Sequence, residues 1–402
     1  MLGRLAPQML RYVKSVIPSA HCPSPCSMVA GQPLGDIVAH NGAGGKPWCA
    51  RLGLRLRSAS PFAKKPEGTY TGGMESWDIP AIRALLDHLA DAEPQDEEQW
   101  QGWWIVRVAG GRNNLLFRAT GDGGDLAIKF TVRDERDRVG REFGSLAALR
   151  HAGLSIAPEP VLLDRSRYPQ PVVVQSWLEG EVCATAPTKD AEWEKVAQHL
   201  ASIHTVTPDR TAQSLPWATI NANDAEEGKQ RVREQVAHIP AEARPPALRA
   251  LLRRFEAMRV PAWPSPPVTH CRLDTNLENY IRRPGRWASV DWEYSGWGDP
   301  AFEVANLVTH VAMMEVPASR WAWLVDRYCG RYCGLVEDAT APQRIETYCQ
   351  IMRVWWVARL ARYLYELPRG RDRRLADGPD GWQADIERKY GHYLALAEAA
   401  YM

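Results

Sequence analysis

The spacing of hydrophobic positions changes along the chain and predicts three regions. Residues 1–73 are rich in Gly, Pro, Ser and Ala without sustained periodicity, which is typical of disorder. Residues 74–178 contain short apolar runs separated by Gly-rich turns, a pattern typical of strands. Residues 179–402 repeat apolar positions at intervals of three and four, as helices do. The strand-rich region followed by the helix-rich region predicts an α+β protein with two lobes.

The strand-rich region predicts a small antiparallel sheet. Four apolar runs predict its strands: residues 103–108, 115–119, 126–130 and 172–174. A helix with apolar residues at 82, 85, 86 and 89 precedes them. A second helix follows the third strand and ends at Gly153. In the helix-rich region, residues 280–282 and 288–290 predict a lone hairpin.

Composition and charge narrow the classes of function. A chain of 402 residues with 45% hydrophobic and 24% charged residues is typical of a soluble globular protein with more than one core. Residues 1–73 carry nine Lys and Arg against two acidic residues (+7), which leaves 40 basic and 46 acidic residues (−6) for the rest. We therefore expect no nucleic-acid partner for the folded part. No run approaches the ~18 apolar residues of a membrane span, so we expect no membrane partner.

The eight cysteines form no evident disulfide framework, which favours reduced thiols and a cytoplasmic location. Residues 1–73 have two interpretations beyond plain disorder. The segment is rich in Arg and poor in acidic residues, as transit peptides are. Alternatively, Met74 is the true start and the preceding residues are a misassigned extension, which is the interpretation we favour.

Three oxygen-bearing side chains have the spacing of a metal–nucleotide site. Asp274 and Asn279 lie five residues apart in one expected loop, and Asp291 follows the predicted hairpin. Mg²⁺ takes a few hard oxygen ligands from a protein and leaves its other positions to phosphates and water. Asp and Asn are also common in ordinary loops. The order of loop Asp, Asn, strand, turn, strand and Asp is more specific and predicts phosphoryl transfer, with Asp274 as the base and Asn279 and Asp291 as metal ligands.

Two further groups precede this site in the sequence. Lys129 lies between apolar neighbours on a predicted strand, and Glu142 begins a helix that can pack across that strand. A Lys–Glu pair of this kind holds the ammonium group against nucleotide phosphates. The alternative is a solvent-facing strand residue and a surface helix position.

The turn at residues 110–114 contains glycines and asparagines, namely Gly110, Gly111, Asn113 and Asn114. Its backbone amides can approach a triphosphate because glycine has no Cβ, although most turns of this type only connect strands.

In this order the motifs resemble those of the aminoglycoside phosphotransferase and choline kinase family, which has a protein-kinase-like fold. The resemblance extends from about Ile105 to about His310. It rests on Gly110-Gly111-Arg112-Asn113-Asn114, Ala127-Ile128-Lys129, Arg141-Glu142, Arg272-Leu273-Asp274 to Asn279, and Asp291-Trp292-Glu293 with Gly296-Trp297-Gly298-Asp299-Pro300-Ala301.

The resemblance implies a two-lobed fold, in which a small N-lobe combines an antiparallel sheet with one helix. The larger, mainly helical C-lobe would hold the catalytic loop, the metal site and the acceptor site. The implied reaction is Mg²⁺-dependent transfer of the γ-phosphoryl group of ATP, or of GTP, to a hydroxyl of a small molecule. Lys129 would grip phosphates, Asp274 would serve the acceptor hydroxyl, and Asn279 and Asp291 would hold Mg²⁺. The segment Gln175-Ser176-Trp177 would meet the nucleotide base with its backbone.

One motif departs from the family pattern. The family usually has His-Gly-Asp where this chain has Arg272-Leu273-Asp274. We expect Arg272 to support the loop by hydrogen-bonding carbonyl groups or by pairing with Asp299; lower activity and an altered acceptor are alternatives. Leu273 in place of Gly is expected to restrict the loop to ordinary φ. We interpret Asp299 as a helix start and His204 as a core histidine.

The sequence therefore predicts a small-molecule kinase of two lobes. The alternative, motivated by Arg272 and Leu273, is a nucleotide-binding pseudokinase that acts as a regulatory module with little or no transfer. Sugars, amino alcohols, aminoglycosides and other antibiotics all remain open as the hydroxylated substrate, and the sequence specifies no oligomeric state.

Overall fold

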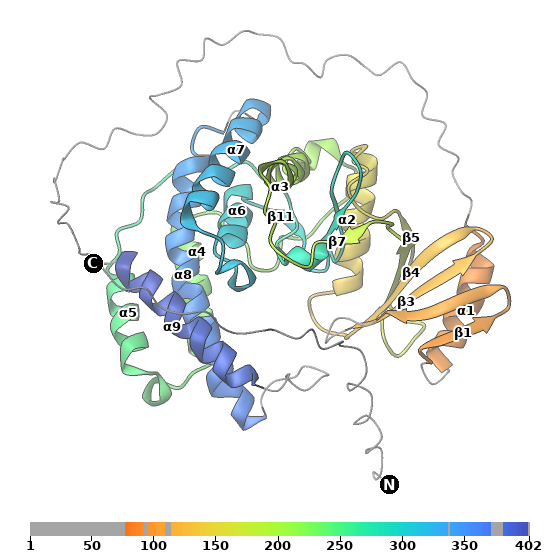
Figure 1. Ribbon diagram of the computed structural model, residues 1–402, viewed down its shortest axis with the longest axis horizontal. Coiled ribbons are helices and arrows are strands. Elements are labelled where there is room, and N and C mark those ends of the chain that lie inside the picture. Colours follow the sequence, from red (N-terminus) through yellow and green to blue (C-terminus); the bar gives the residue numbers. More distant parts are fainter. Residues whose placement is uncertain (1–76, 92–94, 109–113, 337, 371–380, 401–402) are drawn as a thin grey trace, which may run out of the picture. The chain divides into compact units, whose positions relative to one another are not determined.

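A six-stranded antiparallel sheet forms the first lobe, in the order β1-β2-β3-β4-β6-β5 (Figure 1). The computed structural model describes residues 77–91, 95–108, 114–336, 338–370 and 381–400. The strands are β1 (Glu97–Trp100), β2 (Trp103–Val108), β3 (Asn114–Gly121), β4 (Gly124–Thr131), β5 (Pro160–Asp164) and β6 (Val172–Ser176). All four strands predicted from the apolar runs are therefore present, and β1 and β5 are additional.

Two helices flank this sheet on opposite faces. α1 (Ile79–Asp91) shares a core with Ile128 and Phe130 of β4. Successive strand residues point to opposite faces, so Lys129 faces the other side, where its ammonium group meets α2 (Arg138–His151). The alternation along β4 thus supplies one face with a core and the other with a charged site.

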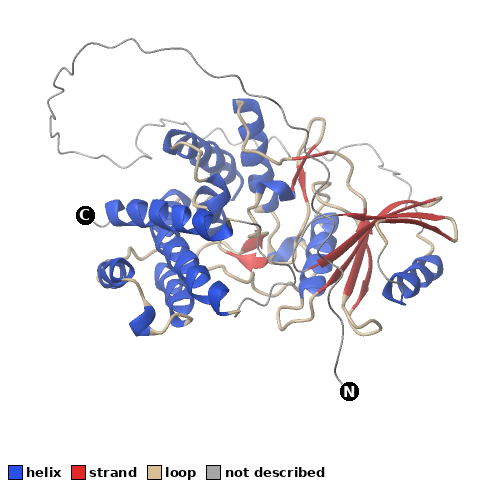
Figure 2. Ribbon diagram, turned by 60° about the horizontal axis from the view of Figure 1, so that its bottom comes forward, coloured by secondary structure: helices blue, strands red, loops and turns tan. Residues whose placement is uncertain are grey.

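Helices dominate the second lobe, as the apolar spacing predicts (Figure 2). They are α3 (Asp190–Ile203), α4 (Ala225–Ala237), α5 (Pro246–Glu256), α6 (Pro300–Val308), α7 (Ala318–Val336), α8 (Ala341–Glu366) and α9 (Trp382–Ala400). α8 contributes buried residues along most of its length and packs against α4, α6 and α9. It is therefore the central element of this lobe's core.

Short strands carry the loops of the candidate site. β9 (Tyr280–Arg282) and β10 (Ala288–Ser289) form the predicted hairpin, but it is not a lone one, because β7 (Glu181–Val182) adds a third strand to β9. β8 (Thr269–Cys271) and β11 (Gly296–Gly298) pair separately and bracket the hairpin in sequence. The two-residue β7 offered too short a pattern to be predicted.

A third core joins α2 to the second lobe. Leu146 and Leu149 of α2 pack in one cluster with Ile203, Trp292 and Trp297. This contact fixes α2, and with it Glu142, relative to the segment that carries Asp291.

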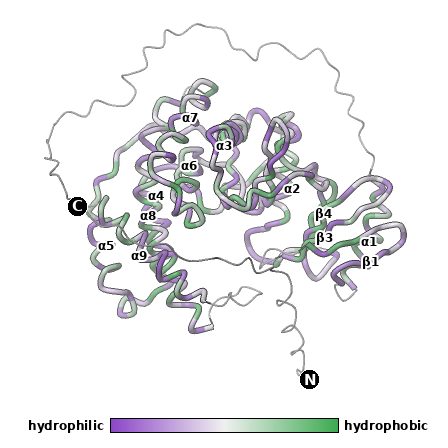
Figure 3. Tube along the Cα trace, in the orientation of Figure 1, coloured by the Kyte–Doolittle hydropathy of each residue, from purple (hydrophilic) through white to green (hydrophobic). Residues whose placement is uncertain are grey.

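Hydrophobic and hydrophilic residues alternate along most elements (Figure 3). Within the part of the chain that the structure describes, every helix is too short or too polar to cross a membrane.

Candidate active site

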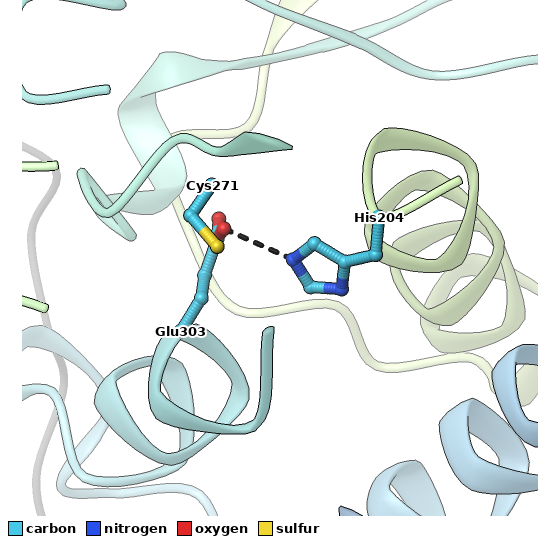
Figure 4. A group of neighbouring side chains, drawn as sticks. All are labelled: His204, Cys271 and Glu303. Atoms are coloured by element: carbon cyan, nitrogen blue, oxygen red, sulfur yellow. Dashed lines mark hydrogen bonds and ion pairs between the residues drawn. The ribbon is translucent and has the colours of Figure 1, made fainter. Parts of the chain in front are cut away.

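The loop that carries Asp274 is anchored by two buried side chains, those of His204, which directly follows α3, and of Glu303 on α6. The Glu303 carboxylate accepts a hydrogen bond from the backbone N–H of Arg272 at 2.8 Å and another from His204 Nε2 at 3.0 Å (Figure 4). His204 Nδ1 in turn accepts from the Tyr328 hydroxyl at 2.8 Å. His204 is thus a core histidine, as the sequence indicates.

The sulfur of Cys271 lies beside this pair, and all three side chains are buried. Because Glu303 is already bound by His204 and by a backbone amide, we interpret the group as a structural anchor for the loop rather than as a metal centre.

Leu273 contradicts the expectation of ordinary φ. Its φ is +61°, in the left-handed region, and its side chain is only 3% exposed. Asn306 Nδ2 donates to the Leu273 carbonyl at 2.9 Å. Burial of the side chain and this hydrogen bond hold a conformation that local preference disfavours, so the tertiary structure, and not the residue type, sets the backbone here.

The hairpin brings the two predicted metal ligands together. The backbone N–H of Val290 donates to the carbonyl of Asn279 at 2.9 Å, so Asp291 follows directly on a residue bonded to Asn279. Asp291 also has a left-handed φ of +61°. Both side chains are partly exposed, as groups that bind a solute must be.

Lys129 lies at the centre of a charged cluster that both lobes contribute to. Its Nζ is 2.8 Å from Glu142 Oε2, 2.5 Å from Asp291 Oδ1 and 3.7 Å from Glu293 Oε2. The predicted Lys129–Glu142 pair is therefore present, and the alternative of solvent-facing residues is wrong, because the two side chains are 7% and 1% exposed.

Burial and charge shift the pKa values of this cluster in opposite ways. Burial acts to lower the pKa of Lys129, but Asp291, Glu142 and Glu293 raise it well above its ordinary value, so the ammonium stays charged. Burial raises the pKa of Glu142 to about 7 against the opposing effect of Lys129. Burial, and then the charge of Asp291, raise the pKa of Asp274 to about 6, although Arg272 opposes the shift.

Two residues outside the predicted set, Glu293 and Arg138, complete the cluster. Glu293 accepts from Arg138 Nη1 and lies 3.5 Å from Asn114 Nδ2, so it joins the segment after Asp291 to α2 and β3. Arg138 stands one turn before Glu142 on α2, and residues four apart share a helix face. That spacing places Arg138 on the same helix face as Glu142, but no local pattern indicates its bond to Glu293, 155 residues away.

The charge balance fits a divalent cation. Asp274, Asp291, Glu142 and Glu293 supply four carboxylates, whereas Lys129, Arg138 and Arg272 supply three positive charges. An excess of hard oxygen donors, part of it accessible, is what Mg²⁺ prefers. Asn279 and Asp291 would hold such an ion.

The remaining predicted nucleotide-binding residues fall into two groups. Gln175 is buried on β6 next to Ala127 of β4, with its Oε1 atom unpartnered among the described residues. Trp177 follows β6, but its backbone N–H already donates to the Asp125 carbonyl at 2.7 Å, so that amide is not available to a base. Gly110, Gly111 and Asn113 lie outside the described residues, as do residues 1–73.

Asp299 and Arg272 do not pair, contrary to one of the two expectations for Arg272. Asp299 caps α6 by accepting from the Ala301 N–H at 2.9 Å, which confirms the predicted helix start, and it binds Arg344. Arg272 instead donates to the carbonyl of Val290 at 3.2 Å, which is the other expectation.

Comparison with known proteins agrees with this geometry. A sequence model of the phosphotransferase enzyme family (APH) matches residues 104–345, more than half of the chain. The chain belongs to this family. A search of curated proteins found no match.

Solved structures show the same fold at low identity. A Ralstonia eutropha protein provisionally assigned as an aminoglycoside phosphotransferase has a TM-score of 0.55 at 17% identity, over 81% of this chain and 97% of that one. A choline kinase of Cryptosporidium parvum has a TM-score of 0.51 at 12% identity, over 80% and 98%. A spectinomycin phosphotransferase, in complex with ADP and spectinomycin, has a TM-score of 0.50 at 10% identity, over 80% and 98%.

These neighbours confirm the predicted kinase-like fold, with an antiparallel sheet in the first lobe and helices in the second. Together with family membership they support a small-molecule phosphotransferase.

Proposed function

We propose that the protein is a Mg²⁺-dependent kinase that transfers the γ-phosphoryl group of ATP to a hydroxyl group of a small molecule. The observation that carries the proposal is the bonding of Lys129 to Glu142 on one side and to Asp291 on the other, next to the loop of Asp274. Phosphoryl transfer depends mainly on positioning and on neutralising charge, and these groups supply both.

Each lobe contributes a separate part of this chemistry. Lys129, held by Glu142, offers its ammonium group to the phosphates of the donor. In the second lobe, Asn279 and Asp291 offer oxygen ligands for the metal ion. A Mg²⁺ ion bound there would neutralise the charge of the transferred group. Because Asp291 is bound to Lys129 in this structure, we expect donor binding to separate these two side chains.

Asp274 is the group that serves the acceptor. Its raised pKa of about 6 leaves the carboxylate ionised at neutral pH but more basic than an ordinary aspartate. A carboxylate of this kind can accept the hydroxyl proton and orient the oxygen for attack. Its backbone anchors, Glu303 and Asn306, keep it in place without taking part in the chemistry.

A binding assay and a transfer assay test the proposal together. Thermal melting of the full chain is measured with ATP or GTP, each with and without Mg²⁺. A coupled assay for nucleoside diphosphate release then screens sugars, amino alcohols and aminoglycosides as acceptors. We expect Mg²⁺·ATP to raise the melting temperature and at least one acceptor to give turnover above background hydrolysis. Stabilisation by Mg²⁺·ATP without transfer to any acceptor would favour the pseudokinase. If there is neither stabilisation nor transfer, the proposal that the protein binds nucleotides is refuted.

A further inference from the structure

Arg272 is a fully buried arginine at the centre of the candidate site. Its side chain has 0% exposure, although a buried guanidinium group is costly unless it is bound. It donates from Nη1 to the Val290 carbonyl at 3.2 Å. Its guanidinium carbon lies 4.6 Å from the Tyr280 ring centre and 5.9 Å from that of Trp292. Its Nε and Nη2 atoms have no hydrogen-bond partner among the described residues, so the single carbonyl and the two rings are the contacts that hold the guanidinium group.

Arg272 contacts both sequence neighbours of Asp291. Arg272 binds the carbonyl of the residue before Asp291 and lies near the ring of the residue after it. The same Val290 donates its N–H to the Asn279 carbonyl, so both polar groups of Val290 are fixed. Asp291 itself has a left-handed φ of +61°, which a non-glycine residue keeps only where the surroundings impose it.

The backbone of Arg272 is fixed independently. Its N–H donates to Glu303, whose carboxylate is buried in the core of the second lobe. Arg272 therefore connects a rigid point of that lobe to the segment that carries Asp291. Asp274 lies only two residues further along the same loop.

We propose that Arg272 is a positioning residue for the metal ligands Asn279 and Asp291. It holds the Val290 peptide, which is itself bonded to the Asn279 carbonyl, and keeps the backbone at Asp291 in its left-handed conformation. The inference rests on the proposed function, because it assigns these two residues to the metal. Arg272, which stands where the family usually has His, would therefore contribute to metal binding as well as to folding.

Binding of Mn²⁺·ADP, followed by the loss of the free Mn²⁺ signal in electron paramagnetic resonance, tests this role without reference to turnover. Arg272→Lys keeps the charge but loses the planar fork, and Arg272→Met keeps the length without any donor. Metal-free ADP binding is measured in parallel by displacement of a fluorescent analogue. The control is Arg344→Lys, since Arg344 is equally buried but binds Asp299 and Asp338 away from the ligands.

We expect Arg272→Lys to weaken Mn²⁺·ADP binding by about ten- to a hundred-fold, the range for a hydrogen bond made by a charged group, with metal-free ADP binding unchanged. Arg344→Lys should lower the melting temperature and leave the Mn²⁺·ADP affinity as it is. If Arg272→Met does not fold, the Mn²⁺·ADP affinity of Arg272→Lys alone tests the inference. Unchanged Mn²⁺·ADP affinity in a folded Arg272 variant, or an equal loss of metal-free ADP binding, would overturn the inference alone. A wild-type chain that binds no Mn²⁺·ADP would overturn the proposed function as well.

Discussion

Replacing Asp274 by Asn should stabilise the protein while removing its activity. The carboxylate is half-buried, and this loss of solvent, followed by the charge of Asp291, raises its pKa from 3.8 to about 6. A difference of about two pKa units at about 1.4 kcal/mol per unit corresponds to about 3 kcal/mol of folding free energy lost when the folded protein must hold the ionised form. Asn is nearly isosteric, keeps an oxygen for the Asn276 N–H, and carries no charge.

The sign and the pH range follow from the direction of the shift. The pKa of Asp274 is higher in the folded protein than in the unfolded chain. Ionised Asp274 therefore costs no folding free energy below pH 3.8, and its full cost is reached above about pH 6. The gain of Asp274→Asn should therefore be largest, up to about 3 kcal/mol, above pH 7 and about half as large at pH 5.

Thermal melting without divalent cations measures this gain, at about 1–2 °C per kcal/mol for a chain of this length. Asp338→Asn is the matched control, because the Arg344 ion pair lowers the pKa of Asp338 despite its burial, and its loss should destabilise the protein at pH 7.5. A melting temperature of Asp274→Asn that is not raised at pH 7.5, or a gain that is the same at both pH values, would refute the reasoning.

Two further predictions concern the loop and the cluster. Leu273→Gly should lose less stability than Leu273→Ala, because glycine alone relieves a left-handed strain of about 1–2 kcal/mol. Leu324 of α7 is also buried but lies in a helix, so there the Gly variant should be the less stable of the two. The urea midpoints of the four variants check both statements. Lys129→Met should abolish transfer and cost about 3–5 kcal/mol of stability, since it leaves buried carboxylates without their cation. Adding Glu142→Gln to that variant should restore part of the melting temperature and none of the activity; recovery of transfer in the double variant would contradict the assigned role of Lys129.

Local patterns were enough to predict most of the elements around the site and the pairing of Lys129 with Glu142. The short apolar run at residues 126–130, which follows a Gly-rich turn, placed Lys129 on a strand, and helical spacing placed Glu142 on a helix that can pack across it. β1 was missed because Glu97, Glu98 and Gln99 lack any apolar alternation, and its pairing with β2 is decided by the neighbouring strand.

Features set by contacts between distant segments could not be predicted. The left-handed φ of Leu273 depends on Asn306 and on burial, and nothing local to the loop encodes it. The bond between Arg138 and Glu293 requires the approach of two segments 155 residues apart. The choice of Arg272 between a carbonyl and Asp299 likewise depended on Arg344, which occupies Asp299 from another helix.

Phosphoryl transfer by the Asp274→Asn variant tests the central claim most directly. Once an acceptor is found, wild type and variant are compared under saturating Mg²⁺ and ATP, with Mg²⁺·ATP binding measured on the same samples. The account predicts a folded variant that binds Mg²⁺·ATP but transfers at least about a hundred-fold more slowly, the usual contribution of a positioned base. A folded Asp274→Asn variant that retains more than a few per cent of wild-type turnover would contradict it.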